Sequence, residues 1–197
     1  MLDIYPKLLN EEDRSLIRNF SCVEADCDLQ HIDSKARRRI KKRSREMDQF
    51  LKEEAIDEQT KNLNTTHLFL DANSGELVGF VSLCSDSIPL QLSERAAYHI
   101  KYQNVPAIKI ARLATCQKYQ HQGIAQYLIS YAVYRALKMR DHCGVKFLTL
   151  DCYKHRVGFY EKQGFERNLT QSTEASYDAP ISMRLHIDDY LESYLEK

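Results

Sequence analysis

The chain has 197 residues, and its 28 lysine and arginine residues balance its 28 aspartate and glutamate residues. This neutral balance, with 43% hydrophobic residues, is typical of a globular protein and excludes binding of a polyanion by bulk charge. No stretch approaches the roughly 18 apolar residues of a membrane-spanning helix, so we expect a cytoplasmic protein without membrane contact. One domain, residues 1–197, is predicted because a chain of this length can bury a core without disulfides or metals.

The six cysteines follow no repeated spacing. Cys84, Cys116 and Cys152 lie in or beside apolar runs, where a thiol behaves as a small hydrophobic group, so reduced thiols are expected. Cys27 and His31 have the spacing of a pair of metal ligands, but no second pair follows at a matching distance. No metal site is therefore predicted.

The first sixty residues predict a strand, a short helix and a long helix. An apolar run over residues 2–9 precedes the acidic helix start Asn10–Asp13. Apolar residues then recur at helical spacing, which indicates one long amphipathic helix near 35–58. Its second half is acidic, whereas its first half carries eight basic residues: Lys35, Arg37, Arg38, Arg39, Lys41, Lys42, Arg43 and Arg45.

The rest of the chain alternates strands and helices. Residues 67–71 and 76–83 flank Ala72-Asn73-Ser74-Gly75, which is the pattern of a β-hairpin. Six further elements are predicted from hydrophobic periodicity, in the order helix, strand, helix, strand, helix and strand: residues 93–101, 105–116, 121–139, 145–150, 156–163 and 181–187. This order predicts an α/β (α+β) fold with a mixed sheet and crossover helices on its faces.

The segment Gln120-His121-Gln122-Gly123-Ile124-Ala125 lies between the predicted strand 105–116 and the predicted helix 121–139. Such a loop directs several backbone N–H groups to one point, and the helix dipole adds partial positive charge. A phosphate or pyrophosphate can therefore be held without a lysine, and Gly123 and Ala125 leave room for it. A single glycine also occurs at helix starts for conformational reasons, so the loop has to be judged in its context.

That context is Ala111-Arg112-Leu113-Ala114-Thr115 before the loop and Gly158-Phe159-Tyr160-Glu161-Lys162-Gln163-Gly164-Phe165 after the next strand. Together these segments resemble the GNAT superfamily of acetyl-coenzyme A (acetyl-CoA) dependent N-acetyltransferases, most strongly from Ile108 to Phe165. Several segments also resemble the subgroup that contains the acetyltransferase toxins of toxin–antitoxin modules: Phe20-Ser21-Cys22, the helix from Phe50 to Ala55, the strand from Ile110 to Ala114, and Phe159-Tyr160.

The resemblance implies a mostly antiparallel mixed sheet of about six to seven strands, flanked by helices. It implies that residues 105–116 and 145–150 form a parallel central pair that splays apart to admit the thioester. The pyrophosphate of acetyl-CoA would lie on Gln120, His121, Gln122, Gly123, Ile124 and Ala125, and the pantetheine arm on Leu113, Ala114 and Thr115. Tyr160 matches the tyrosine that protonates the departing thiolate.

The implied reaction needs few side chains, because an amine attacks the thioester carbonyl directly. A backbone N–H of Leu113–Thr115 would stabilise the oxyanion, and Tyr160 would act as general acid. The strand 105–116 lacks the glutamate that many members use as general base. The asparagine and alanine common before the tyrosine motif are also missing, so Lys154 or Arg156 could instead meet the phosphates.

The acceptor stays open at this point. It is a small amine or a protein N-terminus, or the amino group of aminoacyl-tRNA, as in the toxin subgroup. Outside the enzyme class, a non-catalytic acyl-CoA-binding module would explain the missing carboxylate. The run Lys35 to Arg45 is either a solvated helix face or a contact for RNA, and its pairing with the acidic half of the helix would give a homodimer. Specificity is expected in the loops 86–103 and 170–178.

Overall fold

The computed structural model describes residues 3–169 and 179–195, so the predicted specificity loop 170–178 lies outside the described residues. The chain forms two compact units. Unit 1 contains Met1–Leu83 and Arg112–Ile129, and unit 2 contains Cys84–Ala111 and Ser130–Lys197. The single domain that the sequence suggests stays a prediction.

Within the described residues, seven strands form one sheet in the order β1-β2-β3-β4-β5-β7-β6. Their bounds are β1 (Ile4–Leu8), β2 (Thr65–Asp71), β3 (Leu77–Pro89), β4 (Asn104–Thr115), β5 (Phe147–Cys152), β6 (Glu166–Arg167) and β7 (Ile181–His186). The pair β4–β5 is parallel. The pairs β1–β2, β2–β3, β5–β7 and β6–β7 are antiparallel. The predicted mixed, mostly antiparallel sheet with one parallel pair is thereby confirmed.

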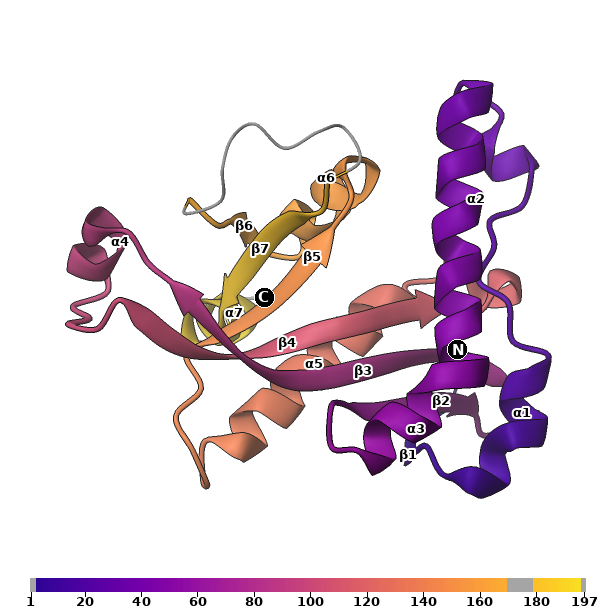
Figure 1. Cartoon of the computed structure of the whole chain (residues 1–197), viewed down its shortest axis with the longest axis horizontal. Helices are drawn as coiled ribbons and strands as arrows, with labels where there is room; N and C mark the ends of the chain where they lie inside the picture. The colour runs from indigo at the N-terminus through magenta and orange to yellow at the C-terminus, as the bar shows by residue number, and fades with distance from the viewer. Residues whose placement is uncertain (1–2, 170–178, 196–197) are drawn as a thin grey trace. The chain divides into compact units, whose positions relative to one another are not determined.

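Unit 1 contains helices as well as the antiparallel strands β1, β2 and the first part of β3. Helix α1 spans Arg14–Arg18, α2 spans Ser34–Gln49 and α3 spans Ala55–Thr60. A π-helical turn over Phe50–Glu54 joins α2 to α3, as can be followed in Figure 1. The core between these elements contains fully buried side chains from both layers, including Leu51, Leu68 and Phe80.

Unit 2 contains residues 104–111 of β4, and β5 lies between this part of β4 and β7 (Figure 1). Its helices are α4 (Leu92–Ala97), α6 (Lys154–Lys162), α7 (Ile187–Leu195) and the greater part of α5 (Ile124–Met139), which begins in unit 1. Phe147 of β5 is fully buried and packs with Ile88, Leu90 and Val105. Gly164 has a φ of +89°, which lets the chain turn after α6 as predicted.

The structure moves several predicted boundaries. Helix α5 begins at Ile124 rather than 121, because His121 and Gly123 have positive φ values that a right-handed helix does not allow. Strand β3 continues to Pro89, six residues past the predicted end. Among the helices of residues 3–169 and 179–195, none is both long and apolar enough to cross a bilayer.

Candidate active site

The predicted pyrophosphate loop is a tight connection between β4 and α5 in unit 1. A 3₁₀ turn over Gln117–Tyr119 follows β4, and His121 and Gly123 then adopt left-handed φ values of 61° and 79°. A Cβ atom placed on Gly123 would meet no atom within 4 Å, so open space lies beside this residue. The loop thus exposes its backbone where the sequence predicts a ligand.

The amide groups of this loop are available for an anion. No hydrogen bond within the described part of the chain uses the backbone N–H groups of residues 121–125. The first N–H groups of α5 have no partner inside the helix, and the helix dipole places partial positive charge there. Several donors without a partner among the described residues therefore lie at the N-terminus of this 16-residue helix.

A segment near the N-terminus holds the loop in place. The Gln120 side-chain amide donates to the Cys22 carbonyl oxygen at 2.8 Å, and the Gln117 backbone N–H donates to the Ser21 carbonyl oxygen at 2.7 Å. Asp48 of α2 is buried and accepts from the Cys22 backbone N–H at 2.8 Å and from the Ser21 hydroxyl at 2.9 Å. Helix α2 is therefore anchored to the same segment that supports the loop.

Glu76, at the hairpin between β2 and β3, supports the 3₁₀ turn from another direction. Its carboxylate accepts hydrogen bonds from the Lys118 ammonium and from the Tyr119 hydroxyl. The hydrogen bond from Lys118 has the largest effect on the pKa of Glu76, and together with that from Tyr119 it lowers this pKa. Sequence reasoning missed Glu76 and Asp48, because both act over a long sequence separation and carry no local motif.

The predicted pantetheine strand is the end of β4. A Cβ atom on Gly79 would lie 2.8 Å from the Ala114 carbonyl oxygen, so β3 can approach β4 this closely only with glycine. The hydroxyl oxygen of Thr115 is buried and makes no hydrogen bond to the described residues. Buried hydroxyl groups are rarely left without a partner, so the end of β4 fits a polar ligand.

Tyr160 lies on α6 in unit 2 and is half-buried. Its ring packs edge-on against Phe159 and Phe165, with centroids 5.1 and 5.6 Å away. Burial, with a further contribution from the Cys152 thiol, raises the pKa of Tyr160 to about 12. Its hydroxyl donates to no group in residues 3–169 and 179–195, so it is a protonated donor that a ligand can use.

The parallel pair has a short register. Ala107–Ile110 of β4 pair with Phe147–Leu150 of β5. In the described part of the chain this register ends at Ile110 and Leu150, although β4 continues to Thr115 and β5 to Cys152. Two polar interactions involve residues of the paired segment. The Lys109 ammonium contacts the Asp151 carboxylate at 2.6 Å, and the Thr149 hydroxyl donates to the Asp86 carboxylate at 2.5 Å.

Other candidates from the sequence are placed as follows. Lys154 and Arg156 are exposed in the first turn of α6. His121 is exposed, and its Nε2 lies 3.6 Å from the Asp28 carboxylate. Within the described residues, no group of three or more histidine, cysteine, aspartate or glutamate side chains is arranged to hold a metal ion.

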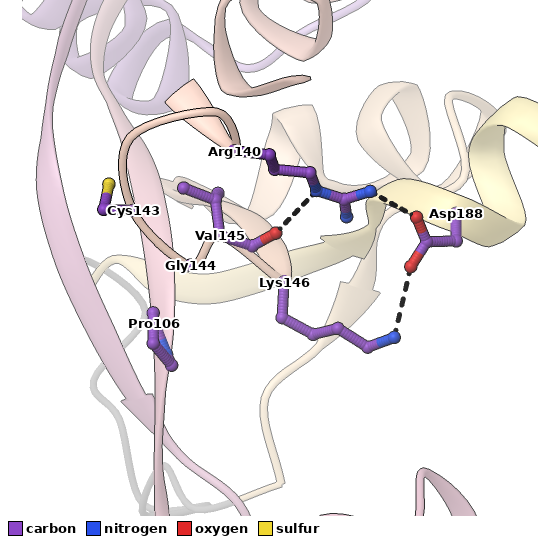
Figure 2. A pocket seen from close by; sticks show the side chains of 7 residues that line it. All are labelled: Pro106, Arg140, Cys143, Gly144, Val145, Lys146 and Asp188. Atoms are coloured by element: carbon purple, nitrogen blue, oxygen red, sulfur yellow. Dashed lines mark hydrogen bonds and ion pairs between the residues drawn. The ribbon is translucent and has the colours of Figure 1, made fainter. Parts of the chain in front are cut away.

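A hollow of about 350 Å³ also occurs in unit 2 (Figure 2). It is lined by Pro106, Arg140, Cys143, Gly144, Val145, Lys146 and Asp188. Figure 2 shows Arg140 and Lys146 converging on Asp188, at 2.5 and 3.1 Å. None of the predicted site residues lines this hollow, and its cations are engaged by the carboxylate.

Known proteins resemble the chain over most of its length. The tRNA-acetylating toxin of Mycobacterium tuberculosis is 24% identical over 125 residues, which are 63% of this chain and 74% of that protein. The structure of a tyrosine-to-phenylalanine variant of KacT has a TM-score of 0.72 at 16% identity, covering 97% of this chain and 99% of that one. AtaT complexed with acetyl-methionyl-tRNAfMet has a TM-score of 0.72 at 15% identity, covering 98% and 99%. These structures share the fold.

The family model of the acetyltransferase (GNAT) domain matches residues 24–186. The matched range contains the loop between β4 and α5, the end of β4 and Tyr160. The resemblance that the sequence motifs indicated is confirmed, and the chain belongs to the GNAT acetyltransferase family.

Proposed function

We propose that the chain transfers the acetyl group of acetyl-CoA to a primary amine by direct attack in a ternary complex. The observation that carries this proposal is the loop of residues 120–125, whose unpaired amides lie at the N-terminus of α5. A pyrophosphate is the ligand that such a group of donors suits. A related fold, AtaT, has been solved with acetyl-CoA and the C-terminus of its antitoxin AtaR, which agrees with this assignment.

In the proposed complex, Leu113, Ala114 and Thr115 hold the pantetheine arm and supply a backbone N–H to the oxyanion. The buried Thr115 hydroxyl supports this role, because it has no partner among the described residues. Tyr160 protonates the coenzyme A sulfur as the C–S bond breaks. Its raised pKa, about 12, supports this role because the phenol stays protonated at neutral pH.

We further propose that the acceptor is the amino group of an aminoacyl-tRNA. Four basic residues of α2 are exposed and follow one another at steps of three, four and three residues: Lys35, Arg38, Lys42 and Arg45. This spacing places them on one helix face over about 15 Å. The other basic residues of the run are half-buried; Lys41, for example, contacts Asp26 at 2.7 Å.

A linear array of cations is complementary to the phosphates of a nucleic acid strand. The array agrees with the names of two relatives, a tRNA-acetylating toxin and AtaT in complex with acetyl-methionyl-tRNAfMet. A solvated helix face would show the same residues, so the array needs a direct test.

The test incubates the purified chain with labelled acetyl-CoA and, in separate reactions, bulk aminoacyl-tRNA, small amines and peptides with free N-termini. We expect label on the amino group of aminoacyl-tRNA. Label on small amines or peptides alone would replace the proposed acceptor. Binding of acetyl-CoA without transfer to any acceptor would contradict catalysis and indicate an acyl-CoA-binding module.

The α2 array is tested by changing its four basic residues to glutamine. The logarithm of the tRNA binding constant decreases linearly with the logarithm of the salt concentration, and each phosphate contact contributes about 0.7 to the steepness of this line. Loss of four contacts should therefore make the line less steep by about 3. The affinity for acetyl-CoA should stay unchanged. A control changes four exposed basic residues elsewhere to glutamine, Arg14, Arg18, Lys61 and Lys138, and removes the same charge. Equal losses of tRNA binding in both variants would contradict a specific array.

A further inference from the structure

A row of polar residues crosses the sheet of unit 2. Lys109 of β4 is in register with Thr149 of β5, and Thr149 is in register with Arg184 of β7. Residues in register on neighbouring strands project from the same face of a sheet. Thr149 is almost fully buried, at 1% exposure, so its hydroxyl needs a partner inside the protein.

That partner is Asp86 of β3. The Thr149 hydroxyl donates to one carboxylate oxygen of Asp86 at 2.5 Å, and the Ser87 backbone N–H donates to the other at 2.8 Å. The two donors fix the orientation of the carboxylate. Asp86 is half-buried, so a ligand can still reach it from solvent.

Two carboxylates, Asp86 and Asp151, share the single ammonium of Lys109, so negative charge is in excess here. Lys109 pairs with Asp151 at 2.6 Å, and Arg184 forms a buried pair with Glu94 at 2.6 Å. Burial lowers the pKa of Lys109, but the hydrogen bond to Asp151 and the charges of Asp151 and Asp86 outweigh this effect and raise it. Asp86 itself forms no ion pair with any described residue. This face therefore presents a carboxylate to which an external cation can bind.

Asp86 and Tyr160 act on opposite faces of the same strand. Thr149, which holds Asp86, and Cys152, which lies close to Tyr160, are three positions apart on β5 and so project from opposite faces. Their separation along the strand is about 10 Å. In the proposed function, a thioester enters beside the end of β5. An amine would then attack from the Asp86 face, and the sulfur would leave toward Tyr160.

We propose that Asp86 binds the ammonium form of the acceptor and takes its proton, in place of the strand glutamate that the sequence lacks. This inference rests on the proposed function, because it concerns the same reaction. It assigns to the acceptor a charged anchor on β3, outside the motifs that indicated the cofactor.

The proton transfers balance as follows. The ammonium gives one proton to Asp86, and the nitrogen lone pair then forms the C–N bond at the thioester carbonyl. The C–S bond breaks with its electron pair on sulfur, which takes a proton from Tyr160. Asp86 releases the first proton to solvent and then takes the second nitrogen proton, which it also releases, while Tyr160 regains a proton from solvent. One ammonium and one thioester yield one amide, one thiol and one proton.

The experiment compares the pH dependence of kcat/KM for wild type and Asp86→Asn, with bulk aminoacyl-tRNA and with L-methioninamide as acceptors. The wild type uses the ammonium form, so its kcat/KM should stay level from about pH 6 up to the pKa of an α-amino group, about 8. Asp86→Asn can use only the neutral amine. Its kcat/KM should fall about tenfold for each pH unit below 8.

Two further variants sharpen the test. Thr149→Val removes the hydroxyl that orients Asp86 and should show a weaker form of the same pH-dependent loss, which provides a second measurement if Asp86→Asn does not fold. Asp141→Asn removes an equal charge at an exposed position of unit 2 and should match the wild type.

The outcomes distinguish the two levels of the proposal. A loss in Asp86→Asn that is equal at every pH would indicate a structural role and overturn the inference alone. A wild-type kcat/KM that already falls tenfold for each pH unit below pH 8 would also overturn the inference alone. A folded wild type that acetylates neither acceptor would overturn the proposed function together with the inference.

Discussion

At the scale of single residues, Tyr160 offers the sharpest change. Its ring packs against Phe159 and Phe165, whereas its hydroxyl makes no hydrogen bond to a described residue, so Tyr160→Phe keeps the packing and removes only the proton donor. General acid catalysis contributes about 10²- to 10⁴-fold, and we expect kcat to fall within that range. Acetyl-CoA should bind with unchanged affinity, as measured by calorimetry.

The pKa of Tyr160 also sets a pH limit. A donor whose pKa is raised to about 12 is protonated below that pH and lost above it, so no decline in wild-type rate below about pH 10 should come from Tyr160. Tyr134→Phe, at a half-exposed tyrosine of α5, is the matched control and should keep wild-type rates. Rates in Tyr160→Phe within twofold of this control would contradict the assigned role.

At the scale of elements, Asp48 connects α2 to the loop of residues 120–125 through residues 21–22. Asp48→Ala leaves the buried Cys22 N–H without its acceptor, which costs about 1–3 kcal/mol of folding free energy. The melting temperature should fall by several degrees, at about 2–4 °C per kcal/mol. The affinity for acetyl-CoA should fall as well, because Gln117 and Gln120 bond to the same segment.

The control for Asp48 is Asp57→Ala in α3. Asp57 is exposed and contacts Lys61 at 2.7 Å on the helix surface, where an ion pair contributes little to stability. This variant should melt close to the wild type and bind acetyl-CoA normally. If Asp48→Ala melts and binds like Asp57→Ala, residues 21–22 do not support the loop.

Periodicity predicted the elements that carry long amphipathic patterns. The predicted strands and helices from 67 to 187 all occur, and the parallel pair β4–β5 that the family resemblance implied is present as well. It missed β6, because two residues are too short to show a pattern, and it missed α7, whose start at Ile187 it assigned to the preceding strand. The π-helical turn between α2 and α3 has the apolar spacing of an ordinary helix and was not distinguishable.

At the scale of the whole molecule, the loop of residues 120–125 was predictable and the grouping of residues around Asp86 was not. Gly123 and the amides of α5 follow from local sequence, since one short segment supplies them all. Asp86, Thr149 and Lys109 come together only when β3, β4 and β5 pair, and no spacing along the chain reveals this. The family resemblance therefore predicted the loop, while the structure shows that Asp86, Thr149 and Lys109 lie together.

The proposed acceptor predicts an effect on living cells. Acetylation of aminoacyl-tRNA removes the free amino group that peptide-bond formation needs, so induced expression of the wild-type chain in bacteria should arrest growth. Expression of Tyr160→Phe at an equal level should restore growth in large part. Growth at the normal rate with abundant wild-type protein would count against aminoacyl-tRNA as the acceptor.

Binding of acetyl-CoA at residues 120–125 is the central claim, and calorimetric titration of wild type, Gly123→Glu and Gly75→Glu tests it most directly. Both glycines have positive φ and open space around a Cβ, so both variants carry similar backbone strain, but only Gly123 lies in the proposed pyrophosphate site. We predict that wild type and Gly75→Glu bind, and that Gly123→Glu binds roughly a hundredfold more weakly, by about 2.7 kcal/mol. Absence of binding to the folded wild type, or equal binding by Gly123→Glu, would contradict the account.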